Sequence, residues 1–211
     1  MAATVSRRGF ARLLGAGVTL AALPGGRSAA MRLSDPVPPA LPPRRGPILL
    51  NANENPYGPS PASLAAMRDA VPFSCRYPDE QAEALAAAVA AHLRLPVDHV
   101  LLGEGSSEIL KLAVTAGAGP NRRVVVADPT FEAVGVYAAN AGMEVAKVPL
   151  TADFRHPLDA MRSLARGAGL VYVCNPNNPT ASVTPAAELR AFLAAVPPET
   201  VVLVDEAYHH F

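Results

Sequence analysis

Short apolar runs alternate with longer amphipathic segments along most of the chain. Most of these runs are continuously apolar rather than alternating with polar residues, which is typical of strands buried on both faces of a sheet. The pattern predicts strands at residues 100–102, 124–127, 144–148, 170–174 and 201–204.

The segments between these strands carry helical patterns. A helix is predicted at residues 79–95, because Pro78 and Asp79 give a start signal and Pro96 stops the helix. Further helices are predicted at residues 106–116, 131–141, 158–165 and 185–195. Since strands and helices alternate, the predicted fold class is α/β, with three layers: a mostly parallel sheet covered by helices on both faces.

The composition is that of a folded protein. Half of the 211 residues are hydrophobic, 17% are charged, and 18 basic and 18 acidic side chains give a formal net charge of zero. Such a chain can bury a sizeable core, and it has no basic stripe with interleaved aromatic residues, so no nucleic-acid partner is predicted. Many of the 22 prolines fall between Pro36 and Pro61, which predicts an extended arm.

The cysteines and histidines do not form a pattern typical of a metal site. Neither of the two cysteines, Cys75 and Cys174, has a second metal-ligating residue at CxxC spacing. Cys174 ends an apolar run and is interpreted as a buried, unreactive thiol. His209 and His210 are adjacent, so their side chains do not face together, and no metal ligand is predicted.

The first 30 residues have the features of an export signal. Arg7 and Arg8 precede an apolar stretch at residues 13–23 that is too short to span a bilayer, and small residues follow it. The paired arginines resemble a twin-arginine signal, which predicts export to the bacterial periplasm. The alternative is an N-terminal helix that is retained in a cytoplasmic protein. The prediction is a signal peptide (1–30), an N-terminal arm (31–72) and a large domain (73–211).

Polar clusters follow four of the predicted strands. Ligands of parallel sheets gather at the carboxyl ends of the strands, so these clusters are candidate functional positions. The turn at residues 103–107 opens a helix, where backbone N–H groups and two hydroxyls can hold a phosphate; an ordinary helix cap is the alternative. Asp205 follows four apolar residues, and a buried carboxylate there needs a cation or a protonated ring nitrogen as its partner.

Taken in order, these clusters resemble the fold-type I pyridoxal-phosphate (PLP) aminotransferases, and most closely the histidinol-phosphate aminotransferase branch. The resemblance covers residues 51–211. Each motif is modest by itself, but six of them occur in the order that is typical of the family. They are Asn51-Ala52-Asn53-Glu54-Asn55-Pro56, Arg76-Tyr77-Pro78-Asp79, Gly103-Glu104-Gly105-Ser106-Ser107-Glu108, Asp128-Pro129-Thr130-Phe131, Asn175-Pro176-Asn177-Asn178-Pro179-Thr180 and Asp205-Glu206-Ala207-Tyr208.

The resemblance implies that the large domain binds PLP as cofactor. Asp205, the implied catalytic residue, would pair with the ring nitrogen and keep it protonated, so that the ring accepts electrons from the substrate. Phe131 would stack on the ring, unless it is an ordinary core phenylalanine. The other implied ligands are the phosphate-binding residues Gly105, Ser106 and Ser107, and Asn178 and Tyr208, which would donate hydrogen bonds to the phenolic oxygen of the ring.

The resemblance also implies a homodimer. Tyr77 would reach the phosphate bound by the other subunit, and the alternative is that Tyr77 packs locally in a turn. Asn53 and Glu54 resemble the segment that closes over the substrate.

The implied activity is transfer of an amino group between an amino acid, or a histidinol-phosphate-like amino-alcohol phosphate, and a 2-oxo acid. The family's Schiff-base lysine is expected a few tens of residues beyond Asp205, and Lys111 and Lys147 do not occupy that position, so the 211-residue chain is expected to be inactive alone. Ala181 stands where relatives usually have glycine, which predicts modest backbone strain. The alternatives are a decarboxylase or carbon–sulfur lyase on the same scaffold, and a non-catalytic exported remnant.

Overall fold

The structure is a computed structural model that describes residues 51–55, 57–117, 119 and 122–210. The described residues divide into two compact units, one that extends to Ala84 and one that begins at Leu85. The predicted signal peptide and residues 31–50 of the predicted arm lie outside the described residues. None of the described helices has the length and apolar character needed to cross a membrane.

The first unit contains a helix that the sequence analysis did not predict. This helix, α2 (Pro61–Ala70), is followed by the 3-10 helix η1 (Val71–Phe73) and by the beginning of α3 (Asp79–Leu93). The Ser63 backbone N–H donates to the Ser60 hydroxyl over 3.1 Å, and Pro61 occupies the first helical position. A serine cap followed by proline is a helix start signal, so the sequence did contain the evidence for α2.

Helix α3 begins at Asp79 as predicted but ends two residues early. Arg94 has a φ of 55°, a left-handed conformation that ends the helix before Pro96. The 3-10 helix η2 (Val97–His99) follows. The predicted strand at residues 100–102 is wrong: the backbone is extended at Val100, but no described strand pairs with this segment, and a strand needs a neighbour for its hydrogen bonds.

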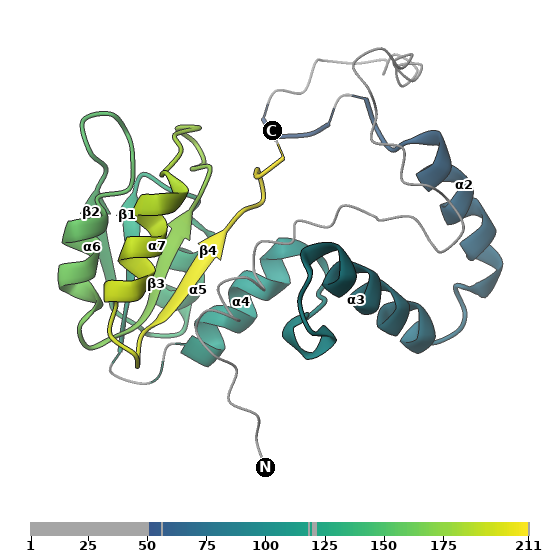
Figure 1. The fold of residues 1–211 in the computed structure, drawn as a ribbon, viewed down its shortest axis with the longest axis horizontal. Coiled ribbons are helices and arrows are strands. Elements are labelled where there is room, and N and C mark those ends of the chain that lie inside the picture. The colour runs from purple at the N-terminus through teal and green to yellow at the C-terminus, as the bar shows by residue number, and fades with distance from the viewer. Residues whose placement is uncertain (1–50, 56, 118, 120–121, 211) are drawn as a thin grey trace. The chain divides into compact units, whose positions relative to one another are not determined.

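The second unit is built on a four-stranded parallel sheet. Its strands are β1 (Arg123–Asp128), β2 (Val145–Pro149), β3 (Ala168–Cys174) and β4 (Val201–Asp205), in the order β2-β1-β3-β4 (Figure 1). All three strand pairs are parallel. The four corresponding predicted strands are therefore confirmed, with ends that differ by no more than two residues.

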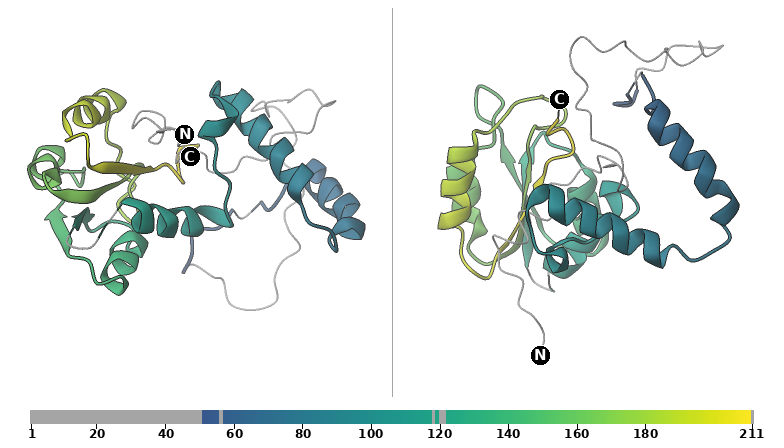
Figure 2. Two further views of the ribbon diagram at one scale, coloured as in Figure 1. Left: turned by 90° about the horizontal axis from the view of Figure 1, so that it is seen from below. Right: turned by 45° about the vertical axis from the view of Figure 1, so that its right-hand side comes forward.

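Helices cover both faces of this sheet (Figures 1 and 2). Helices α4 (Gly105–Gly117) and α5 (Ala133–Asn140) lie on one face, and α6 (Leu158–Ala165) and α7 (Ala186–Ala195) lie on the other. Each of these helices was predicted, and the fold class, a three-layer α/β arrangement with a parallel sheet, is confirmed.

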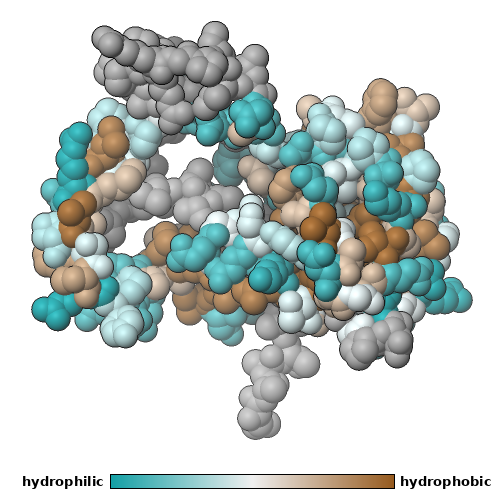
Figure 3. Space-filling view, turned by 180° about the vertical axis from the view of Figure 1, so that it is seen from behind, coloured by the Kyte–Doolittle hydropathy of each residue, from teal (hydrophilic) through white to brown (hydrophobic). Residues whose placement is uncertain are grey.

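The strands form two core layers because successive side chains point to opposite faces. Val125 and Val171 pack against α6 and α7, whereas Val124 and Tyr172 pack against α4 and α5. Every residue of β3 is buried, which explains why its sequence is continuously apolar. Other apolar side chains lie at the surface among polar ones (Figure 3). Phe73 and Leu101 are two such exposed side chains.

Candidate active site

The parallel sheet brings the carboxyl ends of its strands to one edge. Cys174, the last residue of β3, lies opposite Asp205, the last residue of β4. The backbone N–H of Asn175 then donates to the carbonyl oxygen of Asp205 over 2.8 Å. The strand β1 pairs with the other side of β3, so three of the predicted polar clusters meet at this edge of the sheet.

Asp205 is buried, as the sequence predicted, and is only 6% exposed. It lies two residues after Leu203, so its side chain points to the sheet face that α4 and α5 cover. Its Oδ1 accepts a hydrogen bond from the Ala207 backbone N–H (3.1 Å), and its Oδ2 accepts one from the Tyr172 hydroxyl (2.9 Å). None of the ion pairs among the described residues includes Asp205.

The Tyr172 contact is a feature of the site that the sequence analysis missed. Tyr172 lies in the middle of β3 and is fully buried, which sequence reasoning interprets as ordinary core. Burial raises the pKa of its hydroxyl far above the usual range, and the nearby Cys174 and Asp205 reinforce this increase. Tyr172 is therefore a permanent hydrogen-bond donor to the carboxylate.

Cys174 brings several predicted site residues together. Burial raises the pKa of its thiol, and the charge of Asp205 adds to this effect. Hydrogen bonds from the backbone N–H groups of Asn178 and Phe131 act in the opposite direction and lower the pKa of the thiol. Phe131 also packs, half-buried, against the core layer under α4 and α5. Backbone groups of Phe131 and Asn178 and the carboxylate of Asp205 therefore all influence this buried thiol.

Asn177 connects the loop after β1 to the loop after β3. Its side chain is 2% exposed; its Oδ1 accepts a hydrogen bond from the Thr130 hydroxyl (2.6 Å), and its Nδ2 donates to the Pro129 carbonyl oxygen (3.2 Å). The same Nδ2 donates to the Thr180 hydroxyl (2.8 Å). Asn177 holds the loops that carry Phe131 and Asn178 in one arrangement, a role that the sequence analysis did not assign.

The predicted phosphate-binding turn opens helix α4. Gly105 has a φ of 74° and open space where a side chain would stand, and it is the first residue of the helix. Ser106 and Ser107 follow in the first turn, where both are exposed. The Glu104 backbone N–H donates to the Glu108 carboxylate over 2.5 Å, which orders the turn. Exposed hydroxyls at the positive end of a helix dipole are suited to an anion.

Tyr208 and Tyr77, the two predicted tyrosine ligands, have different surroundings. Tyr208 is half-buried three residues after Asp205, on the segment that leaves the site edge. Beside it, burial raises the pKa of Glu206, and His209 opposes this effect. Tyr77 belongs to the other unit, in which its side chain is 90% exposed.

Ala181 has the strained backbone that the sequence predicted. Its φ is 56°, in the left-handed region that a residue with a Cβ rarely adopts. Its N–H donates to the Asn177 carbonyl oxygen over 2.8 Å, and this turn returns the chain after the Asn178 loop. The surrounding hydrogen bonds therefore hold the alanine in a conformation suited to glycine.

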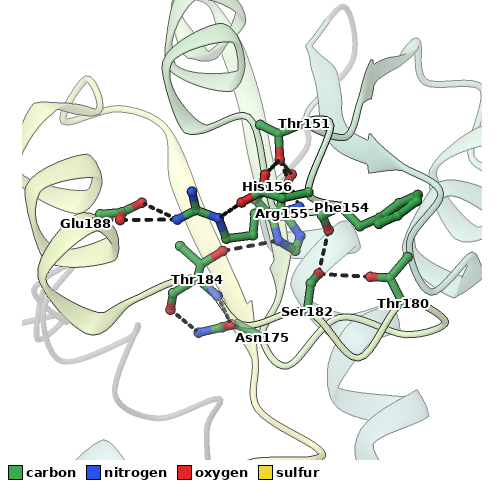
Figure 4. Close-up of polar contacts among 10 residues, drawn as sticks. Thr151, Phe154, Arg155, His156, Asn175, Thr180, Ser182, Thr184 and Glu188 are labelled. Atoms are coloured by element: carbon green, nitrogen blue, oxygen red, sulfur yellow. Dashed lines mark hydrogen bonds and ion pairs between the residues drawn. The ribbon is translucent and has the colours of Figure 1, made fainter.

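A second cluster of polar side chains connects the loop after β2 to the loop after β3 through hydrogen bonds (Figure 4). The Ser182 hydroxyl donates to the Phe154 carbonyl oxygen over 2.5 Å. The Asn175 side chain donates to the Thr184 carbonyl oxygen (3.0 Å) and accepts from the Thr184 N–H (2.8 Å). These contacts close the base of the loop that carries Asn178.

His156 lies at the centre of this second cluster and is 5% exposed. Its Nδ1 lies 3.5 Å from the Thr184 hydroxyl, and its Nε2 has no hydrogen-bond partner among the described residues. Burial lowers the pKa of His156 to about 4, so the imidazole of the folded protein is neutral at pH 7. Beside it, Arg155 forms an ion pair with Glu188 at 3.3 Å.

Residues 45–211 match the family "Aminotransferase class I and II". The chain belongs to this family. It is 46% identical over 165 residues to a histidinol-phosphate aminotransferase of Symbiobacterium thermophilum, covering 78% of this chain and 45% of that protein. It is 41% identical over 167 residues to an aromatic amino acid aminotransferase of Rhodococcus jostii, covering 79% of this chain and 47% of that protein.

A solved structure supports the same assignment. The histidinol-phosphate aminotransferase of Sinorhizobium meliloti, in complex with pyridoxal-5′-phosphate, has a TM-score of 0.71 and 32% identity, covering 75% of this chain and 43% of that one. The predicted family, and with it PLP as the cofactor that the family uses, is confirmed, so the chain belongs to a family of enzymes. The aminotransferase chain described here spans slightly less than half the length of these relatives.

Proposed function

We propose that this chain forms the cofactor-binding part of a PLP-dependent aminotransferase. The whole protein would move an amino group between an amino acid, or a histidinol-phosphate-like amino-alcohol phosphate, and a 2-oxo acid. The observation that carries the proposal is Asp205, a buried carboxylate at a strand end with two hydrogen-bond donors and no ion-pair partner among the residues described. A protonated ring nitrogen supplies the positive charge that such a carboxylate needs.

The residues present fit PLP in their chemistry. When bound, PLP supplies an electron-accepting ring for the transfer of the amino group. Asp205 would hold a proton on the ring nitrogen, and the half-buried Phe131 would orient the ring. The remaining contacts would be made by Gly105, Ser106 and Ser107 to the phosphate and by Asn178 and Tyr208 to the phenolic oxygen.

Assembly and location complete the proposal. The 90% exposure of Tyr77 within its unit leaves the side chain available to a second subunit, which supports a homodimer. The paired Arg7 and Arg8 before a short apolar stretch support export by the twin-arginine route. Lys111 and Lys147 do not occupy the position of the family's Schiff-base lysine, so we propose that these 211 residues alone do not transfer amino groups.

The cofactor proposal is tested by PLP titration of the chain and of two aspartate variants. Asp205→Ala should weaken saturable PLP binding by roughly tenfold or more, because the ring nitrogen loses its counter-charge. Asp128→Ala is the matched control: Asp128 also ends a strand, but it is exposed and pairs with Lys147 at 3.3 Å. In a form of the protein that carries the lysine, Asp205→Ala should lower kcat on the order of a hundredfold. Equal PLP affinity in both variants would contradict the proposal.

A further inference from the structure

Tyr172 and the Ala207 backbone hold the Asp205 carboxylate from two directions. The Tyr172 hydroxyl donates to Oδ2 over 2.9 Å, and the Ala207 N–H donates to Oδ1 over 3.1 Å. The terminal torsion of an aspartate side chain is broad and poorly restrained by itself. One donor on each oxygen fixes the plane of the carboxylate and leaves it further lone pairs for another donor.

We propose that Tyr172 is a positioning residue that orients the Asp205 carboxylate toward the ring nitrogen of PLP. The inference rests on the proposed function, because it assigns Tyr172 a role in the same site. Tyr172 and Asp205 project from neighbouring strands onto the same face of the sheet, since Tyr172 pairs in register with Leu203, two residues before Asp205. The hydroxyl of Tyr172 therefore reaches the Asp205 carboxylate from the side of the buried core layer.

The chemistry of Tyr172 suits this role. Because burial raises the pKa of its hydroxyl, Tyr172 keeps its proton and always acts as a donor to the anionic carboxylate. Hydrogen bonds to a charged acceptor are the stronger ones, and they become stronger away from water. Without the hydroxyl, the buried Oδ2 would lose its donor, and only the Ala207 N–H on Oδ1 would still restrain the plane of the carboxylate.

The decisive variant is Tyr172→Phe, which keeps the aromatic ring in the core and removes only the hydroxyl. Binding would be measured for PLP and for a PLP analogue that has carbon in place of the ring nitrogen. We expect Tyr172→Phe to weaken PLP binding on the order of tenfold and to leave binding of the analogue unchanged. If Tyr172 served only to fill the core, Tyr172→Phe would change the binding of both ligands equally or leave both unchanged.

Two further variants complete the comparison. Tyr137→Phe is the matched control, because Tyr137 packs against the same core layer but does not contact Asp205. Asp205→Asn should show the same selective loss for PLP, and Tyr172→Phe should add no further loss in that background, as expected for two residues that act as a unit.

The outcomes separate this inference from the proposed function. Saturable, Asp205-dependent PLP binding that Tyr172→Phe does not change would overturn the role of Tyr172 alone. Absence of PLP binding to the unsubstituted chain would overturn the proposed function and the inference with it.

If Tyr172→Phe does not fold, the unsubstituted chain with 13C-labelled tyrosine serves instead. The Tyr172 Cζ resonance should shift when PLP binds and remain in place with the analogue, and equal shifts would overturn the inference.

Discussion

Thr130 and Asn177 are 47 residues apart in the sequence and are joined by a part-buried hydrogen bond of 2.6 Å, which the Thr130 hydroxyl donates to the Asn177 Oδ1. This bond connects the loop that follows β1 to the loop that follows β3. Phe131 is the next residue after Thr130, and Asn178 is the next residue after Asn177. The pair therefore sets the relative position of two predicted cofactor ligands.

Asn177→Ala should destabilise the protein and loosen both loops. The substitution removes three hydrogen bonds of the buried Asn177 side chain, so we expect a loss of roughly 2–3 kcal/mol in the free energy of unfolding. Urea unfolding monitored by circular dichroism measures this loss. Asn140→Ala is the control, because Asn140 is exposed at the end of α5 and should change stability by less than about 0.5 kcal/mol. Similar losses in the two variants would contradict the assigned role.

Ala181→Gly should stabilise the protein. Glycine adopts a φ of 56° without the steric cost that alanine bears, although it also increases the freedom of the unfolded chain. We expect a net gain of about 0.5–1 kcal/mol in the free energy of unfolding. The same change at Ala139, in the ordinary helical backbone of α5, should instead cost about 1 kcal/mol. A loss of stability at both positions would show that the backbone at Ala181 is not strained.

Thr200→Val should weaken the junction between α6 and β3. Thr200 is fully buried, and its hydroxyl lies 2.8 Å from the carbonyl oxygen of Ala165 and 3.1 Å from that of Ala168. Valine keeps the shape but not the donor, so the expected loss is about 1–2 kcal/mol in thermal or urea unfolding. Thr115→Val provides the comparison, since the Thr115 hydroxyl makes an exposed bond within α4. The prediction is wrong if Thr200→Val costs no more than Thr115→Val.

The stability of the folded chain should depend on pH through His156. The pKa of His156 is about 4 in the folded protein and near 6.5 when unfolded, so between these values the unfolded state binds a proton that the folded state does not. Stability should therefore fall as the pH is lowered from 6.5 to 4, by roughly 3 kcal/mol in total, and the contribution of His156 should level off below pH 4.

His156→Gln tests this expectation, because it removes the titrating group. Urea unfolding at pH 7 and pH 4.5 should show a smaller decrease for His156→Gln than for the unsubstituted chain. His92→Gln changes an exposed histidine of α3 and should keep the full decrease. A decrease that is identical in all three proteins would assign the pH dependence to other groups.

The sequence by itself determined the order and type of most elements and the positions of the candidate ligands. The period of apolar residues depends only on neighbours along the chain, so four strands and five helices were predicted close to their observed ends. Asp205 could be predicted as a buried carboxylate because four apolar residues precede it directly. The strain at Ala181 was likewise predictable from the motif in which it stands. Helix α2 was not predicted, although its Ser60 cap and Pro61 are local signals in the sequence.

Only the tertiary structure decided which of these residues meet. The strand order β2-β1-β3-β4 and the register that sets Tyr172 beside Leu203 depend on contacts between segments that are distant in the sequence. No local pattern distinguishes Tyr172 from an ordinary core residue, since its partner Asp205 lies 33 residues away. Residues 100–102 show the same limit, because an apolar run becomes a strand only where another strand is present to pair with it. Periodicity is a property of neighbours along the chain, whereas pairing, burial and the buried hydrogen bonds of this site are properties of the folded chain.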